Sequence, residues 1–178
     1  FSGSKTKSTF DVSEAESYYN YAIEHNLITN ENKDRITTEI YAKDSYENIL
    51  YSICRFKEFT KFFYPKYITI VNFAFKFDRF VHHHIKQAIQ FPMKRLNYIK
   101  MQPELDTKHH QMELEKTIPL FEHDPYGCET SLYYKKQSRN PHHLQQTYSM
   151  SSCKELEPLI NICFNTNSNR LVKISWIV

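Results

Sequence analysis

Glycine is nearly absent from this 178-residue chain, which contains only Gly3 and Gly127. Phosphate-binding loops and dinucleotide-binding turns need several glycines at fixed spacing, because their backbone must approach the phosphates closely. The scarcity of glycine therefore excludes a P-loop and a dinucleotide fingerprint. Long apolar runs are also lacking, since none reaches the ~18 residues that cross a bilayer and no stretch has the pattern of a signal peptide. We therefore expect no membrane as a partner.

The four cysteines, Cys54, Cys128, Cys153 and Cys163, form no CxxC pair and show no spacing typical of a secreted disulfide framework. A reduced, cytoplasmic protein is the expectation. Concentrated positive charge is missing as well, because the net charge is +3 and the lysines are scattered along the chain. Nucleic-acid affinity depends on concentrated neutralisation of phosphates, so we do not expect nucleic acid to be the principal partner.

The histidine pattern argues against a metal site. Three histidines are adjacent at 82–84, but neighbouring side chains on a helix point about 100° apart and cannot share one ion. No histidine is followed by another four residues later, which is the spacing of a helical two-histidine zinc site. A GxSxG nucleophile elbow is missing too. We expect no metal, and retain His84 alone as a candidate because it lies near the apolar face of its helix.

The residues that are present predict a folded domain of alternating strands and helices. Apolar spacing of three and four predicts a helix that starts at Asp11 or Ser13, and further helices over 44–60 and 78–90. Apolar or alternating runs predict strands at 35–41, 66–73 and 95–101, with the strand at 66–73 covered on both sides. The opening "FSGSKTK" is typical of the end of a strand running into a loop. This alternation predicts an α/β fold with a mainly parallel sheet.

The rhythm weakens beyond Pro103. Residues 104–153 predict one or two short helices at most, 152–164 a short helix, and 170–178 a last strand or a loose tail. We therefore divide the chain into an α/β core over 1–103 and an irregular C-terminal extension over 104–178, packed on the same domain.

Helices of an open parallel sheet begin beyond the carboxyl ends of the strands, where ligands bind. Three helix N-termini should then direct free N–H groups and partial positive charge into one crevice, where Lys76 and Arg79 would add full charges. Ser13-x-x-Glu16 and Asp44-x-x-Glu47 match the capping box, which needs no ligand. Glu14 and Asn48 are not required by the caps, and for them ligand contact and a plain surface position both stay open.

The order "FSG…K", "SEAE", "A-x-DS-x-EN" and "F-x-F-x-x-x-RF…H" over residues 1–101 resembles the YdcF-like family, domain of unknown function 218, and its longer fungal and other eukaryotic members. The resemblance implies a Rossmann-like three-layer α/β/α fold, no agreed reaction and a nucleotide-like ligand, of which S-adenosylmethionine is one example. Its motif residues correspond here to Ser2, Gly3, Ser13, Glu14, Asp44, Ser45, Glu47, Asn48, Arg79 and His84.

Several positions depart from the family pattern. Ser4 stands in place of a second glycine, which restricts access of this loop to positive φ. Asn72, Phe73 and Lys76 replace the usual threonine–serine–histidine segment. Family members also carry a central strand before the segment equivalent to "FSG", and by this comparison the chain lacks it.

The sequence thus predicts a protein that binds a small anionic, nucleotide-like molecule. Lys76 and Arg79 would hold the anion, Glu14 and Asn48 would fix hydroxyls or an amine, and Glu47 would orient a lysine or an arginine. Whether it is an enzyme stays open. If it is one, Glu14 is the candidate general acid or base, a role that requires burial to raise its pKa. The alternative is a non-catalytic scaffold, or a truncated remnant without a working pocket.

Overall fold

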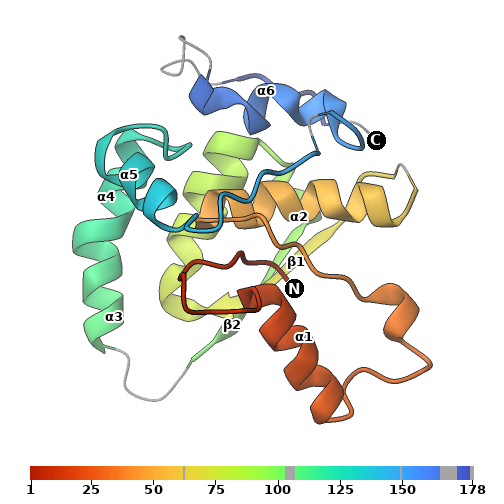
Figure 1. Cartoon of the computed structure of the whole chain (residues 1–178). Helices are drawn as coiled ribbons and strands as arrows, with labels where there is room; N and C mark the ends of the chain where they lie inside the picture. The colour runs from red at the N-terminus through yellow and green to blue at the C-terminus, as the bar shows by residue number, and fades with distance from the viewer. Residues whose placement is uncertain (62, 103–106, 149, 165–171, 177–178) are drawn as a thin grey trace.

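The computed structural model describes residues 1–61, 63–102, 107–148, 150–164 and 172–176. The α-helices and strands are α1 (Glu14–Glu24), α2 (Ser45–Phe59), β1 (Ile68–Phe73), β2 (Leu96–Met101), α3 (Thr107–Met112), α4 (Ile118–His123), α5 (Thr130–Ser138) and α6 (Glu157–Ile160). Shorter turns and wider helices are η1 (Lys33–Arg35), η2 (Ala74–Lys76), η3 (Arg79–Ile89), η4 (Met93–Arg95), η5 (Glu113–Thr117), η6 (Lys154–Leu156) and η7 (Ile162–Phe164). Figure 1 shows α2 crossing the centre of the molecule, with α1 below it.

The sheet is small and parallel. β1 pairs with β2 in a register that sets Ile68 opposite Leu96 and Phe73 opposite Met101. A second parallel contact joins Ser2 to Glu39 as a single bridge. The strand predicted at 35–41 is therefore reduced to this bridge, preceded by the turn η1. The mixture of helix and parallel strand agrees with the predicted α/β class, whereas the finer three-layer arrangement stays a prediction.

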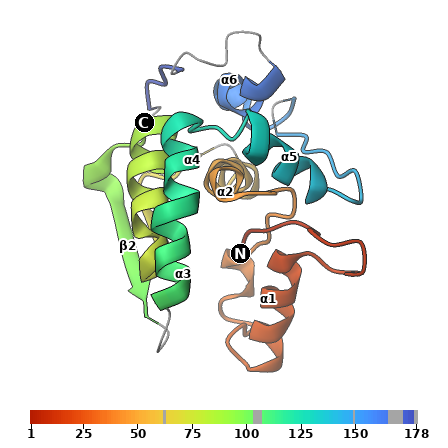
Figure 2. The same ribbon diagram turned by 90° about the vertical axis from the view of Figure 1, so that its left-hand side faces the viewer.

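Only one face of the sheet is covered among the described residues. Ile68 and Ile70 of β1 face the core with Leu96 and Tyr98 of β2, whereas the alternate positions, Val71, Phe73, Ile99 and Met101, are exposed. Figure 2 shows the helices on one side of β2. The prediction that 66–73 is covered on both sides is wrong for this reason.

The helix starts follow local hydrogen bonding. Ser13 and Glu16 form a complete capping box, in which Ser13 N–H donates to the Glu16 carboxylate and Glu16 N–H donates to Ser13 Oγ. Asp44 caps α2 by accepting from Glu47 N–H. The second half of that box is not formed, because the Glu47 carboxylate accepts from Lys43 N–H. The predicted first and second helices are confirmed as α1 and α2.

The third predicted helix is η3, which is wound as a π-helix. It buries Phe80, Val81, Ile85 and Ala88, as the spacing predicted, and it ends at Gln90 in the left-handed region with φ 58°. Its apolar side joins α2 in the main core, with Leu50 and Cys54 on the α2 side. No helix among the described residues is both long and apolar enough to cross a membrane.

The C-terminal part holds more helix than the sequence predicted. Three segments, α3, η5 and α4, follow one another without a break from Thr107 to His123, and α5 adds nine residues. These helices are mostly polar, with few buried residues such as Ile118, Phe121 and Leu132, so their apolar periodicity is weak. The predicted helix at 152–164 appears as η6, α6 and η7. Residues 172–176 form no strand, and Trp176 Nε1–H donates to Ile89 O; the rest of the predicted segment 170–178 lies outside the described residues.

All four cysteines form disulfides. Cys54 pairs with Cys153, 99 residues away, and Cys128 pairs with Cys163, 35 residues away. The expectation that no disulfide framework exists is therefore wrong, because spacing along the chain does not report which residues folding brings together. Disulfides are rare in reducing compartments, and the expected cytoplasmic location stays a prediction.

The two disulfides should differ in their contribution to stability. In the chain-entropy account, removing the Cys54–Cys153 link costs about 1 kcal/mol more than removing Cys128–Cys163, because it closes the longer loop. Urea unfolding of Cys54→Ala/Cys153→Ala and Cys128→Ala/Cys163→Ala proteins would measure this difference. Thiol titration of the unreduced, unfolded wild type should find no free thiol, and four free thiols per chain would contradict the pairing.

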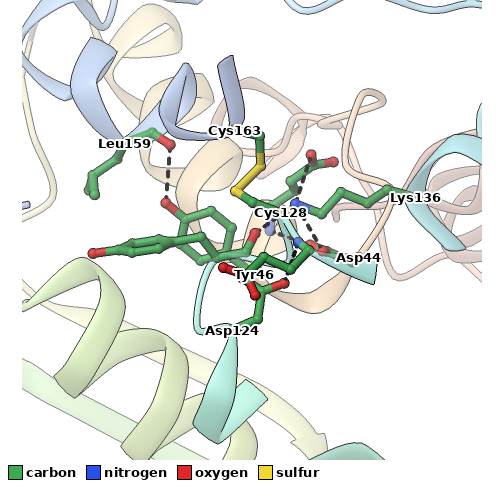
Figure 3. Close-up of a disulfide and its surroundings, with 10 residues drawn as sticks. Asp44, Tyr46, Asp124, Cys128, Lys136, Leu159 and Cys163 are labelled. Atoms are coloured by element: carbon green, nitrogen blue, oxygen red, sulfur yellow. Dashed lines mark hydrogen bonds and ion pairs between the residues drawn. A yellow bond between two sulfur atoms is a disulfide. The ribbon is translucent and has the colours of Figure 1, made fainter. Parts of the chain in front are cut away.

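A buried ion cluster joins α5 to the start of α2. Figure 3 shows the Lys136 side chain reaching Asp44, next to the Cys128–Cys163 disulfide. Lys136 Nζ lies 3.2 Å from Asp44 Oδ2 and 3.6 Å from Glu47 Oε1, and it donates to Tyr126 O at 2.7 Å. Burial disfavours the ammonium, but the two carboxylates outweigh burial and raise the Lys136 pKa. The cluster therefore holds a charged lysine in the interior.

Replacing Lys136 by methionine should destabilise the protein by roughly 3–5 kcal/mol, because Asp44 and Glu47 would keep buried charge without the ammonium. The neighbouring variant Lys135→Met is the matched control, since Lys135 keeps access to solvent although its ammonium is partly desolvated, and it has no carboxylate in contact among the described residues. We expect Lys135→Met to change the free energy of unfolding by less than about 0.5 kcal/mol. Equal losses in urea unfolding of the two variants would refute a special role for Lys136.

Candidate functional site

A cavity of about 780 Å³ opens between α1, the start of α2, the carboxyl end of β1 and α5. Its volume lies within the range of small-molecule sites. Glu14, Asn48 and Arg79, which are far apart along the chain, all line it. The expectation that separate turns gather at one rim is therefore met for these three residues, while contact with a ligand stays a prediction.

Positive side chains dominate the cavity wall. Lys76 and Arg79 come from the segment after β1, and Lys135 and Arg139 come from α5 and its C-terminal end. Burial and the neighbouring Arg79 lower the Lys76 pKa, and burial with Arg139 and Arg79 lowers the Lys135 pKa. Each of these lysines thus carries its charge at an electrostatic cost, which an anion in the cavity would offset.

Carboxylates compensate this charge only partly. Arg79 Nε lies 2.9 Å from Glu113 Oε1, and both side chains are largely buried. The other three cations have no carboxylate in contact among the described residues. Arg139 donates to Lys43 O at 3.1 Å, and Lys76 lies over the rings of Phe73 and Phe75. Two carboxylates also line the cavity, Glu14 and Asp44, and Asp44 is paired with Lys136, so the wall keeps an excess of positive charge.

The helix N-termini contribute less than the sequence predicted. The first N–H groups of α1 are used within the fold, because Glu14 N–H donates to Ser4 O and Ala15 N–H donates to Gly3 O. The chain is already helical at Asp78, so η3 offers no separate N-terminus. At α2, the N–H groups of Ser45 and Tyr46 have no acceptor among the described residues. The start of α2 therefore presents free donors among the described residues, whereas the start of α1 does not.

The predicted site residues fall into two groups. Ser2, Glu14, Asp44, Ser45, Asn48, Lys76 and Arg79 line the cavity. Gly3, Ser13, Glu47 and His84 do not line it and are buried. Gly3 has φ +146°, and a side chain there would collide with Glu14, so this glycine is required by local packing. Ser13 serves the cap of α1, and Glu47 faces Lys136 and Lys43.

Glu14 does not have the environment that a general acid or base requires. Its side chain is exposed, and its carboxylate accepts a long contact of 3.4 Å from the Tyr18 hydroxyl. The burial that this role requires is therefore missing, and the catalytic role of Glu14 stays a prediction.

Glu39 has that environment. It is 2% exposed, accepts from Ser2 Oγ at 2.7 Å and from Tyr41 N–H at 2.7 Å, and burial raises its pKa to about 7. Ser2 also lies 3.0 Å from Asn48 Oδ1, so two residues of the cavity wall connect to this carboxyl group.

Sequence reasoning missed four charged residues of this region, Glu39, Glu113, Lys135 and Arg139. Lys135 and Arg139 are four residues apart, a spacing that sets two cations on one face of a helix, and this signal was available in "KKQSR". Glu39 sits within an apparently ordinary β-branched run, and nothing in the run shows its burial. Within the described residues, no group of histidine, cysteine or acidic side chains could hold a metal ion.

Glu39 should make stability fall as the pH rises. Between about pH 4.5 and pH 7 the unfolded chain loses this proton while the folded protein keeps it, so the folded state loses relative stability through that window. From pH 5 to pH 8 the free energy of unfolding of Glu39→Gln, measured in urea, should rise by on the order of 2 kcal/mol relative to that of the wild type. Glu16→Gln is the control, because the hydrogen bond from Ser13 N–H lowers the Glu16 pKa. A constant offset for Glu39→Gln at both pH values would contradict this assignment.

Comparisons with known proteins add one relative. No protein-family model matches the chain, and no solved structure matches it. The chain is similar to the uncharacterized protein YOR238W of Saccharomyces cerevisiae, with 34% identity over 203 aligned positions that include 87% of this chain. The match spans 66% of the yeast protein, just under two thirds of its length. The name of that relative states no activity. The cavity of this chain is therefore the basis for any functional proposal.

Proposed function

We propose that the cavity binds a small polyanion with a planar ring, such as a nucleoside diphosphate. The observation that carries the proposal is the excess of Lys76, Arg79, Lys135 and Arg139 over the carboxylates in contact with them. A phosphate chain offers several negative oxygens that could meet these cations and the free N–H groups of α2.

The remaining wall suits a ring system. Phe73, Phe80 and Phe121 line the cavity together with Tyr18. Aromatic side chains stack on the flat faces of bases without reading their identity. S-adenosylmethionine is the weaker candidate, because its sulfonium adds positive charge to a wall that already carries an excess.

We also propose the YdcF-like assignment and the three-layer α/β/α fold that it implies. Their support is a second cavity of about 570 Å³ that lies between Phe1–Ser2 and β1, over Ile49 and Ile53 of α2. Among the described residues β1 pairs with β2 alone, so the edge of β1 toward Phe1 is open. A further strand in this slot would join the two parallel pairs into one sheet. The alternative is a non-catalytic scaffold, or a truncated remnant without a working pocket.

Binding should depend on phosphate number and on the α5 cations. We expect affinity in the order ATP, ADP, AMP, adenosine, with S-adenosylmethionine weak, and a Lys135→Gln/Arg139→Gln protein should bind ADP at least tenfold more weakly. Loss of two charge-assisted contacts is the reason. Isothermal titration calorimetry with the wild type would measure this order.

The matched control is Lys86→Gln/Lys94→Gln, which removes the same charge from exposed positions outside the cavity wall. Its affinity for ADP should equal that of the wild type at physiological ionic strength. The proposal would be abandoned if ADP and inorganic pyrophosphate gave no heat with the wild type at millimolar concentration. Equal losses in the two double variants would show nonspecific attraction instead of a site.

A further inference from the structure

Ser45 and His84 form a close pair on the wall of the cavity. Ser45 Oγ lies 2.8 Å from His84 Nε2, although the two residues are 39 positions apart. Ser45 lines the cavity, whereas His84 is fully buried behind it. A serine in contact with a histidine is the arrangement of a nucleophile with its general base. The surroundings of the ring decide whether this pair can have that role.

The far side of the imidazole has no polar partner. His84 Nδ1 is buried and has no hydrogen-bond partner among the described residues. The ring is enclosed by Phe121, Phe80 and Tyr46, with ring centroids 4.6, 5.7 and 6.2 Å away. In serine hydrolases a carboxylate at this nitrogen stabilises the imidazolium that forms when the histidine takes the proton. In the part of the chain that the structure describes, no carboxylate contacts this nitrogen.

Nearby positive charge opposes protonation further. Burial lowers the pKa of His84 well below its ordinary value, and Arg79, His83 and Lys136 lower it in addition. Taking a proton from Ser45 would create a buried cation beside these groups, with an Nδ1–H that has no acceptor. His84 therefore stays neutral.

We propose that Ser45 is a hydrogen-bond donor to an oxyanion of the bound polyanion, and that His84 is a neutral positioning residue for it. The inference rests on the function proposed above and deepens it, because it assigns the subsite for one phosphate group. The Nε2–H tautomer donates to Ser45 Oγ, which leaves the serine proton free for the ligand. Nδ1 is then a buried acceptor without a partner, a condition that proteins tolerate better than a buried donor without one.

The neighbouring groups fit the same task. Ser45 is the first residue of α2, and its own N–H and that of Tyr46 are free. Lys135 and Arg139 line the same cavity. A tetrahedral phosphate could thus accept from one hydroxyl and two amides while the cations balance its charge.

Four variants separate a donor from a nucleophile, with ADP binding measured by calorimetry. Ser45→Ala should weaken ADP binding about tenfold, as expected for one hydrogen bond to a charged oxygen. His84→Leu should cause a similar loss, whereas His84→Gln should bind within about threefold of wild type, because an amide N–H can donate to Ser45 but cannot act as a base. Ser52→Ala is the control, since Ser52 is a hydroxyl of the same helix that lines the other cavity.

Two further measurements do not depend on a ligand. The ¹⁵N chemical shifts of His84 should show a neutral ring protonated at Nε2 at pH 7. A fluorophosphonate probe should leave the intact mass of the protein unchanged. Wild-type protein labelled at Ser45, with labelling lost in His84→Gln, would overturn the inference, and so would an Nδ1–H tautomer.

The inference can fail separately from the proposed function. If Ser45→Ala binds ADP like the wild type while Lys135→Gln/Arg139→Gln loses binding, the cavity is an anion site and Ser45 has no part in it. If the wild type binds neither ADP nor inorganic pyrophosphate, both proposals fall. Thermal unfolding of each variant would confirm that a loss of binding is not a loss of fold.

Discussion

The buried ammonium of Lys136 determines how the candidate site is assembled. It ties α5 to Asp44, the residue that caps α2, and to Glu47 one turn further along. An ion pair out of water must be well compensated, and here two carboxylates and the carbonyl of Tyr126 surround one amine. Any displacement of α5 would break this arrangement, so the position of α5 relative to α2 is fixed. That position brings Lys135 and Arg139 to the cavity.

Adjacent residues of α5 thus have opposite electrostatic situations. Neighbouring carboxylates raise the Lys136 pKa, whereas burial and the neighbouring Arg139 and Arg79 lower the Lys135 pKa. The first lysine stabilises the fold, and the second leaves charge uncompensated in a cavity. A site for an anion needs cations without carboxylate partners, and the fold must bear the free-energy cost of bringing those cations together. The compensated Lys136 cluster next to uncompensated Lys135 meets this requirement.

Local signals predicted most helices and strands of the first hundred residues, except the strand at 35–41, which is reduced to a single bridge. Caps at Ser13 and Asp44 and the apolar spacing after them predicted α1 and α2, and two apolar runs predicted β1 and β2. These features depend on hydrogen bonds and side-chain periodicity within a few residues. The motif residues Glu14, Asn48 and Arg79 were also predicted to lie together, because a parallel arrangement brings the ends of strands to one edge.

What the sequence could not reveal depends on contacts across the chain. The disulfides join residues 35 and 99 positions apart, and Lys136 meets acids more than 80 positions away. Glu39 is buried whereas Glu14 is exposed. The burial of Glu39 follows from its bridge and hydrogen bond to Ser2 in the N-terminal segment. The same limit applies to Ser45 and His84. Motifs can single out both residues, but the apolar surroundings of His84 Nδ1 decide whether His84 is a general base or a positioning residue. What these motif residues could do therefore depends on what surrounds them and not on their identity alone.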